Sequence, residues 1–420
     1  MLALGLLLAG CGTKATLQTG NNVLHETALT VYSSLPLLGG DRASMQAIVN
    51  GEALALYDAG GRVGFGSGRN ATELHISLDS LNDADPALAS WSDDATASAA
   101  KAGSQDLAAA AYIGDFDSGA TWHSLPLTNE NNVLQISPGS PYLGFTDRGP
   151  GVPSTEPGFF YPLGGRHTFV RLVPSYAAEA RATLRLMRSL GVRRLYVLSG
   201  RGDPLDAEIA PLIAADARSA GIALAGRGAI AGGAQGAHEP EDPRQFAALA
   251  HAVAASHADA VLYGGAANTA AAALWRELHA VLPAARLFAP STLAVPAFLT
   301  RLGAAAAATY VTSPYLEPRQ YPPVAQKVLR EYRRLFPGMA PSAYALYGYE
   351  AMRIVLAAIR RAGRQAPKRS TLLDSFFSMG LIHGVIGDYR IESSGDTTLD
   401  RFDGYRVGAG GALVSGRAIG

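Results

Sequence analysis

The 420-residue sequence contains one cysteine and no surplus of either charge, and its first apolar run is too short to span a bilayer. A single cysteine excludes an internal disulfide. Lys+Arg and Asp+Glu number 35 each, which argues against a protein that binds nucleic acid or an anionic membrane through a positively charged surface. Hydrophobic residues make up 48% of the chain, which is too many for wholesale disorder. The length suits two lobes of middle size better than one core.

The cysteine, Cys11, ends the apolar run that begins at Leu2, in the order Leu8-Ala9-Gly10-Cys11. Such a run matches the apolar region of a signal peptide, and small residues before a cysteine resemble a bacterial lipobox. We therefore expect a signal peptide over 1–11, cleavage before Cys11, diacylglycerol on its sulfur, and a flexible tether over 12–26. The alternative is an ordinary secretory signal with an incidental cysteine. No Lys or Arg precedes the run, and a start codon assigned too late would explain this.

Short β-rich runs alternate with helical patterns along most of the chain. Helices are predicted after Ser175, Asp203-Pro204 and Asp242-Pro243, and over 324–336, from caps and apolar spacing. This alternation predicts parallel sheets covered by helices on both sides, in two doubly wound lobes. The strands are expected at 28–34, 74–80, 110–116, 133–138, 168–174, 194–200, 222–228, 260–265, 286–290 and 308–314.

Two segments break this alternation. Residues 140–167 are rich in Gly, Pro and aromatic residues, which predicts a long loop that is functional or partly mobile. After residue 380, two strands are expected on either side of a turn at Ser394-Gly395.

Several segments resemble the type I periplasmic binding proteins of the leucine/isoleucine/valine-binding branch of ABC importers. The resemblance runs in order from about 28 to 408, and it rests on order and spacing. Its segments are AAAYIGDFDSGAT, NVLQISPGSP, DAVLYGGAANTAAAALWREL, PSAYALYGYEAMRIVLAAI and HGVIGDYRIESSGD.

The resemblance implies an α/β fold of two lobes with a hinge and a cleft. The first lobe would comprise 27–170 and 315–380, and the second 171–314 and 381–420. A solute would bind in the cleft, at the carboxyl ends of the strands, and the lobes would close on it. The implied partners are an amino acid or related small carboxylate, an ABC permease with its ATPase, and the membrane through the lipid anchor.

The first-lobe side of the implied site follows the strand at 110–116. Ser118 and Gly119 begin a helix there, where backbone N–H groups and the helix dipole favour a carboxylate. In the family the matching serine binds the ligand carboxylate, with help from the turn that here reads Pro138-Gly139-Ser140. Alternatively, Ser118 only caps its helix.

On the facing lobe the sequence departs from the family pattern. Ser291 stands where an acidic residue usually receives the ligand's ammonium, and a serine cannot neutralise that charge. The aromatic residues that usually wall the site are replaced around Asp203, and at Ala266 and Ala267. These departures predict a wider, less specific pocket.

Substitutes for the missing groups are present in the sequence. Asp115, Asp117 and Asp203 are candidates to meet a cation, although each also suits a cap or a solvated loop. Tyr142 and the cluster Phe159-Phe160-Tyr161 would replace aromatic walls if the loop covers the cleft, whereas such clusters more often pack beneath their own loop.

Enzymatic and metal chemistry is not expected. GFGSG at 64–68 lacks the Lys-Ser or Lys-Thr of a phosphate loop, and Ser118 lies in DSGAT rather than G-x-S-x-G. The nine histidines are scattered, whereas a zinc site needs three or four converging ligands. We therefore expect an importer's solute receptor that needs no cofactor. The alternatives are a sensory receptor of the same fold and a surface module that has lost its ligand.

Overall fold

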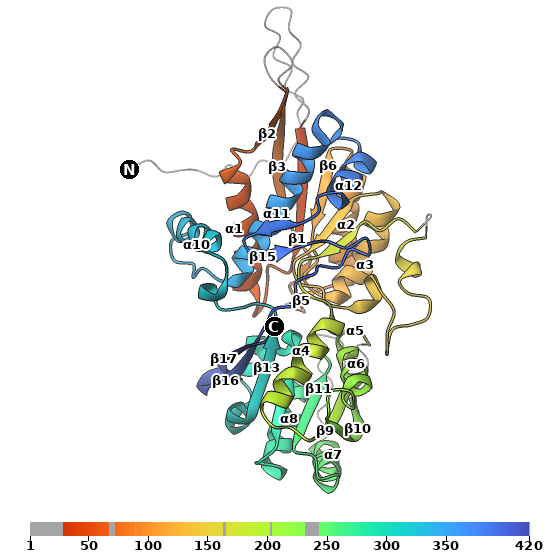
Figure 1. The fold of residues 1–420 in the computed structure, drawn as a ribbon, viewed down its shortest axis with the longest axis vertical. Coiled ribbons are helices and arrows are strands. Elements are labelled where there is room, and N and C mark those ends of the chain that lie inside the picture. Colours follow the sequence, from red (N-terminus) through yellow and green to blue (C-terminus); the bar gives the residue numbers. More distant parts are fainter. Residues whose placement is uncertain are drawn as a thin grey trace, which may run out of the picture.

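The computed structural model describes residues 28–66, 72–88, 90–162, 165–201, 204–231 and 243–419. These residues form two α/β lobes, one above the other in Figure 1. The predicted lipobox with Cys11, the tether over 12–26, and Asp203 lie outside the described residues. Within the described part, no helix is both long and apolar enough to cross a bilayer.

The first lobe is built on a sheet in the order β2-β3-β1-β6-β7-β8. All neighbouring pairs are parallel except β2–β3, a hairpin edge that the sequence analysis missed. Every residue of β6 and β7 is buried, as expected for parallel strands covered on both faces. The strands are β1 (Ala28–Leu35), β2 (Arg62–Phe65), β3 (Thr72–Asn82), β6 (Ala109–Ile113), β7 (Leu134–Ser137) and β8 (Phe169–Arg171).

Helices cover both faces of this sheet. Ala111 and Ile113 of β6 pack in the core with α1 and α11, whereas Tyr112 packs with Ala100 of α2. Neighbouring side chains of a strand point to opposite faces, so α1 and α11 lie on one side and α2 on the other. The helices of this lobe are α1 (Arg42–Asp58), α2 (Asp93–Gln105), α3 (Ser118–Glu130), α10 (Pro323–Leu335), α11 (Ala343–Ala362) and α12 (Arg369–Phe377).

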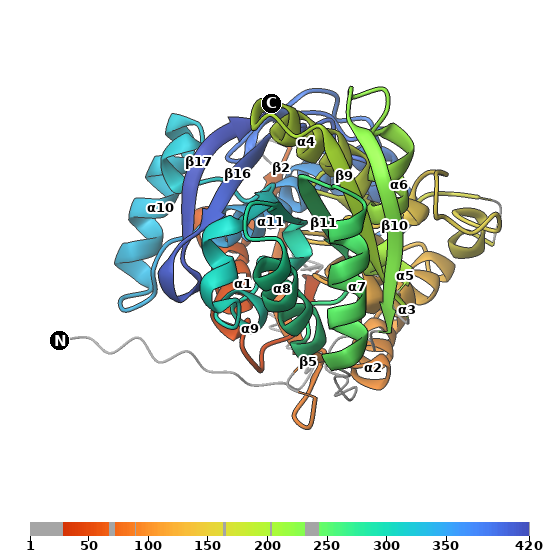
Figure 2. The ribbon, with the colours of Figure 1, turned by 90° about the horizontal axis from the view of Figure 1, so that it is seen from below.

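The second lobe repeats the same parallel order and adds an antiparallel edge. Its sheet runs β10-β9-β11-β12-β13-β16-β17, and β16 and β17 pair antiparallel. Figure 2 shows β10 at one edge of the lobe and β16–β17 at the other. The strands are β9 (Arg194–Arg201), β10 (Ala223–Ala231), β11 (Ala260–Gly264), β12 (Arg286–Ala289), β13 (Thr309–Ser313), β16 (Phe402–Val407) and β17 (Leu413–Ile419).

The two faces of this second sheet carry separate cores. Leu195 and Val197 of β9 pack against α4 and α6, whereas Tyr196 and Leu198 pack against α7 and α8. Asn268 caps α8 by accepting a hydrogen bond from Ala271 N at 2.9 Å. The helices of this lobe are α4 (Tyr176–Ser189), α5 (Pro204–Ala207), α6 (Ile209–Asp216), α7 (Pro243–Ala255), α8 (Thr269–Val281) and α9 (Pro296–Leu299).

The segment after residue 380 differs from the prediction in two ways. Residues 382–389 form a small hairpin of their own, β14 (Ile382–Gly384) with β15 (Gly387–Tyr389), and the turn at Ser394-Gly395 joins only a single antiparallel bridge, between Ile391 and Thr397. The lobe boundary predicted between 380 and 381 is also wrong. Ile382, Tyr389 and Leu399 belong to the first lobe's core, because their apolar side chains pack against it. The chain enters the second lobe only after Leu399, with β16.

The loop predicted at 140–167 lies across both lobes. Leu143 packs in the second lobe's core, and its N–H donates to Glu208 of that lobe at 2.8 Å. Burial raises the pKa of the Glu208 carboxyl to about 8. The aromatic cluster packs beneath its own loop, where Phe160 and Tyr161 join Tyr142 in one apolar cluster. These rings therefore do not wall the cleft.

Candidate functional site

A cavity of about 60 Å³ lies between the lobes at the carboxyl ends of strands. In the first lobe, β1 and β6 are neighbours whose following connections lead to opposite sides of the sheet, to β3 and to β7. This place, where the strand order of the sheet reverses, is the topological switch point, and open α/β sheets bind their ligands there. First-lobe residues that line the cavity are Pro36, Leu38, Asp41, Met45, Ser90, Phe116, Asp117, Ser118, Gly139, Pro141 and Tyr344. Tyr315, from a connecting segment, and the second-lobe residues Ser291, Thr292 and Val295 complete the lining.

Ser118 lies at the first position of α3, shortly after β6 ends at Ile113. Its hydroxyl accepts a hydrogen bond from Tyr142 N at 3.4 Å and lies against the cavity. The N–H groups of a first helical turn have no partners within the helix, so they and the helix dipole favour an anion there. A Cβ on Gly119 would stand 2.1 Å from the ring of Trp91, so only glycine fits beneath that ring.

The turn after β7 is held by serine hydroxyls. Ser137 Oγ accepts from Gly139 N at 3.1 Å and Ser140 N at 2.9 Å, and donates to Asp115 O at 2.6 Å. A Cβ on Gly139 would lie 2.4 Å from the Phe116 ring, so glycine is required where the turn reaches the cavity. Ser140 is fully buried and its hydroxyl pairs with Thr121 Oγ1 at 2.5 Å, so it braces the turn and does not line the cavity.

The acidic residues near this turn have different surroundings. Asp115 lies inside the first lobe, where Tyr112 Oη donates to it at 2.9 Å and Ser124 also donates. Burial raises its pKa to about 6, with Asp83 as a close acidic neighbour. Asp115 therefore does not meet a ligand directly. Asp117 lines the cavity, and so does Asp41, which the sequence analysis did not single out.

The second-lobe wall is built around Ser291. Its backbone N and its Oγ both donate to Glu179 of α4, at 2.6 and 2.8 Å, and Thr312 Oγ1 donates to the same carboxylate at 3.0 Å. Burial raises the pKa of Glu179 to about 7. Because Glu179 is only 1% exposed, it orients Ser291 from behind and does not reach the cavity. No sequence signal connects Glu179 with Ser291, which is 112 residues further along the chain.

Two other predicted second-lobe residues are not part of this wall. Ala267 packs against the second lobe's core and does not line the cavity, because the wall comes from the segment after β12. Asp203 is outside the described residues. Among the described residues, no group of three or more His, Cys, Asp or Glu could hold a metal ion.

Three aromatic rings that the sequence analysis did not place also line the cavity. Tyr315 and Tyr344 stack with ring centroids 4.4 Å apart, and Phe116 lies 6.1 and 6.0 Å from them. They come from the connection after β13, from α11 and from the turn before α3. The aromatic wall expected from the second lobe is thus supplied by the first lobe and a connecting segment.

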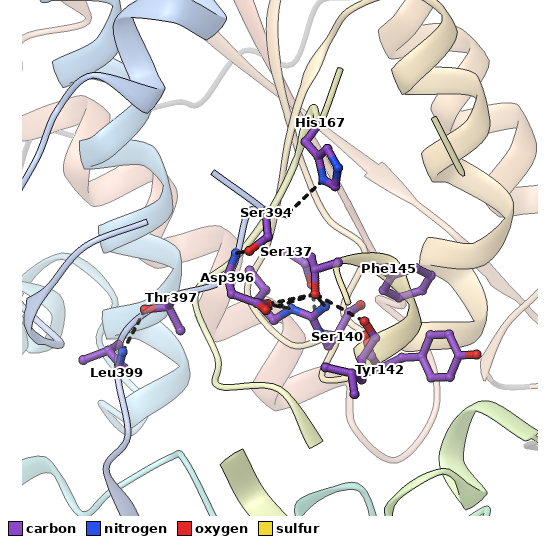
Figure 3. Close-up of polar contacts among 12 residues, drawn as sticks. Ser137, Ser140, Tyr142, Phe145, His167, Ser394, Asp396, Thr397 and Leu399 are labelled. Carbon is purple, nitrogen blue, oxygen red and sulfur yellow. Dashed lines mark hydrogen bonds and ion pairs between the residues drawn. The ribbon is translucent and has the colours of Figure 1, made fainter. Parts of the chain in front are cut away.

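Buried polar contacts join the segments that connect the lobes. Arg171, at the end of β8, is fully buried and its Nε lies 2.8 Å from Asp396 Oδ1, just before the chain returns to the second lobe. Its guanidinium also donates to the carbonyl oxygens of Ser140 at 3.2 Å and Tyr142 at 2.7 Å, and to Thr146 Oγ1 at 2.7 Å. Figure 3 labels Asp396 and Ser140, the two residues that Arg171 joins. The hinge is therefore tied to the turn that lines the cavity.

Comparison with known proteins identifies the family. The sequence profile of the family described as "Periplasmic binding protein" matches residues 35–412. The chain belongs to the periplasmic binding protein family. No curated protein gives a significant match. The resemblance found in the sequence is thus confirmed for family and fold.

Solved structures share the fold of this periplasmic binding protein at low identity. A leucine-binding protein from Thermotoga maritima superposes with a TM-score of 0.73 at 18% identity, over 93% of this chain and 98% of that one. A substrate-binding protein from Desulfitobacterium hafniense in complex with Leu gives 0.71 at 18%, over 92% and 99%. A solute-binding protein from R. palustris in complex with benzoate gives 0.66 at 16%, over 93% and 96%.

Proposed function

We propose that this periplasmic binding protein is the extracytoplasmic solute receptor of an ABC importer, and that it binds an amino acid or a related small carboxylate between its lobes. The observation that carries the proposal is the cavity itself, which is lined by both lobes at the switch point of the first sheet. The family match supports a binding role rather than an enzymatic one. The titles of the similar structures name leucine and benzoate as ligands of those proteins.

In this proposal the ligand carboxylate binds at the start of α3. Ser118 offers a hydroxyl donor there, and Gly119 and Gly139 leave room for the rings of Trp91 and Phe116 that pack against these turns. Ser291 contributes an acceptor from the second lobe, because Glu179 engages its hydroxyl proton. Pro138 and Ser140 act indirectly: Pro138 O accepts from Tyr315 Oη at 2.9 Å, and Ser140 supports the turn.

Delivery to a permease and ATPase would follow closure of the lobes on the solute. A lipid on Cys11 would keep the protein close to the permease and so raise its effective concentration there. This anchor is tested by the mass of the N-terminal peptide from native membranes. A diacylglyceryl cysteine supports it, and an unmodified, uncut N-terminus excludes it.

Solute binding is tested by thermal unfolding of the full chain with a panel of amino acids, amides and small carboxylates. A ligand at 100 times its dissociation constant stabilises the folded state by about 2.7 kcal/mol, which gives a clear rise in the unfolding midpoint. Ser118→Ala should reduce this rise, because it removes the hydroxyl at the cavity. Ser104→Ala is the matched control: Ser104 is equally buried but lies at the far end of α2, away from the cavity. If no solute shifts the midpoint, the proposal fails.

A further inference from the structure

Glu179 is a buried carboxyl group directly behind the second-lobe wall of the cavity. It lies on α4, is 1% exposed and accepts three hydrogen bonds. Ser291 N and Thr312 Oγ1 donate to its Oε1, whereas Ser291 Oγ is the single donor to its Oε2. Among the residues that the structure describes, no Lys, Arg or His pairs with it, so neutral groups alone hold this carboxyl.

No neighbouring charge fixes the protonation state of Glu179. The elements that pack most against α4 are α6, β13, β16 and β17. Burial raises the pKa of Glu179 to about 7, the three donors oppose this rise, and no charged group shifts it. Glu179 therefore gains or loses its proton near neutral pH. The titratable groups described on these elements are Glu208 and Asp216 at the ends of α6, Tyr310 on β13, and Asp403, Tyr405 and Arg406 on β16.

The hydrogen-bond pattern determines which oxygen of Glu179 takes the proton. Oε1 accepts from Thr312 and from the backbone N–H of Ser291, and a backbone N–H cannot reverse its direction. Oε2 contacts only the hydroxyl of Ser291, and a hydroxyl both donates and accepts. A proton on Oε2 therefore makes Glu179 the donor to Ser291 Oγ and leaves the other two hydrogen bonds intact.

This reversal changes what Ser291 offers to the cavity that it lines. With Glu179 ionised, the Ser291 hydroxyl donates its proton to Oε2, and the lone pairs of Oγ make it an acceptor for a solute. With Glu179 protonated, Oγ accepts from Oε2 and its own proton is free, so Ser291 becomes a donor. One proton on a buried group thus inverts the hydrogen-bonding character of Ser291.

We propose that Glu179 is a positioning residue that makes solute binding depend on pH by setting the direction of the Ser291 hydroxyl. Solutes that present a hydrogen-bond donor to Ser291 bind better above neutral pH, and solutes that present only an acceptor bind better below it. By linkage, a solute that donates to Ser291 favours ionised Glu179 and releases a proton, so its affinity rises with pH. This inference rests on the proposed function, because it concerns the regulation of the same cavity.

The first measurement needs no solute. Infrared spectroscopy of the full chain over a series of pH values follows the C=O stretch of protonated carboxyl groups. Part of this band should appear as the pH falls through about 7, and that part should be missing from Glu179→Gln. Glu52 and Asp115 have raised pKa values too, and the difference between the two proteins removes their contribution. Identical bands in both proteins would overturn the inference.

The second measurement is calorimetric titration with two probes of equal length, succinamate and monomethyl succinate. Each has one carboxylate, and the other end is either an amide, which donates hydrogen bonds, or an ester, which only accepts them. Succinamate should bind about two- to tenfold more tightly at about pH 8.5 than at about pH 5.5, the effect of one hydrogen bond, and monomethyl succinate should show the reverse. Any other solute of the panel that binds is titrated at the same two pH values.

The variants separate Glu179 from other titrating groups. Glutamine has the shape of the protonated acid and donates through Nε2, so Glu179→Gln should hold Ser291 as a donor and abolish these pH effects. Ser291→Ala, which removes the hydroxyl and keeps the backbone N–H, should abolish them too. The matched control is Glu52→Gln: Glu52 is also a fully buried acid with a raised pKa, but it does not line the cavity, so the wild-type pH profile should remain.

Titration of Asp41 and Asp115 in the first lobe affects the wild type and Glu179→Gln alike, so the comparison between these two proteins decides. The inference is overturned if both have the same pH profile for every solute that binds. In that case a solute still binds and the proposed function stands. If no probe or panel solute binds at either pH, both fall.

Discussion

Replacing Asp396 by Asn tests how much the buried ion pair between Arg171 and Asp396 stabilises the folded protein. Arg171 is fully buried and lies 2.8 Å from Asp396, whose side chain is 19% exposed. The substitution leaves the guanidinium charge without its counter-ion. Breaking a buried pair from one side costs about 3–5 kcal/mol. Because water reaches part of Asp396, we expect the free energy of unfolding to fall by about 3 kcal/mol, the lower end of this range.

The control is an ion pair on the surface with the same distance between nitrogen and oxygen. Arg166 lies 2.8 Å from Asp374, but their side chains are 37% and 76% exposed. Solvent screens such pairs, so Asp374→Asn should cost less than about 1 kcal/mol. The two substitutions remove the same charge at the same distance, and they differ in burial.

The assay is urea unfolding of the full chain, followed by both tryptophan fluorescence and circular dichroism. Coincident transitions show that the lobes unfold together, which makes the free energies of unfolding comparable. Since Arg171 also holds the carbonyl oxygens of Ser140 and Tyr142, Asp396→Asn should weaken ligand binding as well. Equal losses of stability for Asp396→Asn and Asp374→Asn would refute the reasoning.

Two further predictions concern packing and pH. Gly348→Ala should cost about 1–3 kcal/mol, because its Cβ would lie 2.0 Å from the carbonyl oxygen of Ile48 and force α1 and α11 apart. Gly158→Ala, where nothing lies within 4 Å, should be neutral in the same unfolding experiment, and equal effects would contradict the packing argument. Glu52 is fully buried, and burial raises its pKa from 4.5 to about 8. Between those values the unfolded chain binds fewer protons than the folded one, so stability should fall as pH rises. Glu52→Gln should flatten this slope and the exposed Glu73→Gln should not, which unfolding at a series of pH values would reveal.

Local sequence patterns were enough to predict most of the strands and several of the helices. All ten strands expected from β-rich runs are present, and the helices after Ser175 and over 324–336 begin close to where their caps and apolar spacing place them. Parallel strands covered on both faces appear as short apolar runs, and helix starts carry their own capping residues. For these features the information lies within a few residues of the element itself.

Short strands of mixed composition were harder to predict. β2 was missed because its sequence, RVGF, carries little apolar signal and gains its partner only by pairing with β3. The sequence analysis treated β14 and β15 as one strand and expected it to lead into the next strand at the turn Ser394-Gly395. In the structure β14 and β15 pair with each other, because strand pairing depends on which lobe buries the side chains, and the order of residues along the chain does not specify this.

For the candidate site, too, some features follow from the sequence and others only from the tertiary structure. The sequence alone determined the family, the start of α3 at Ser118, and the absence of an acid at Ser291. Only the tertiary structure decided that Glu179 stands behind Ser291, that Asp41 lines the cavity, and that three rings from separate segments meet beside it. Helix starts and strand ends are set by neighbours in the chain, whereas a cavity between lobes is set by side chains brought together from more than 200 residues apart.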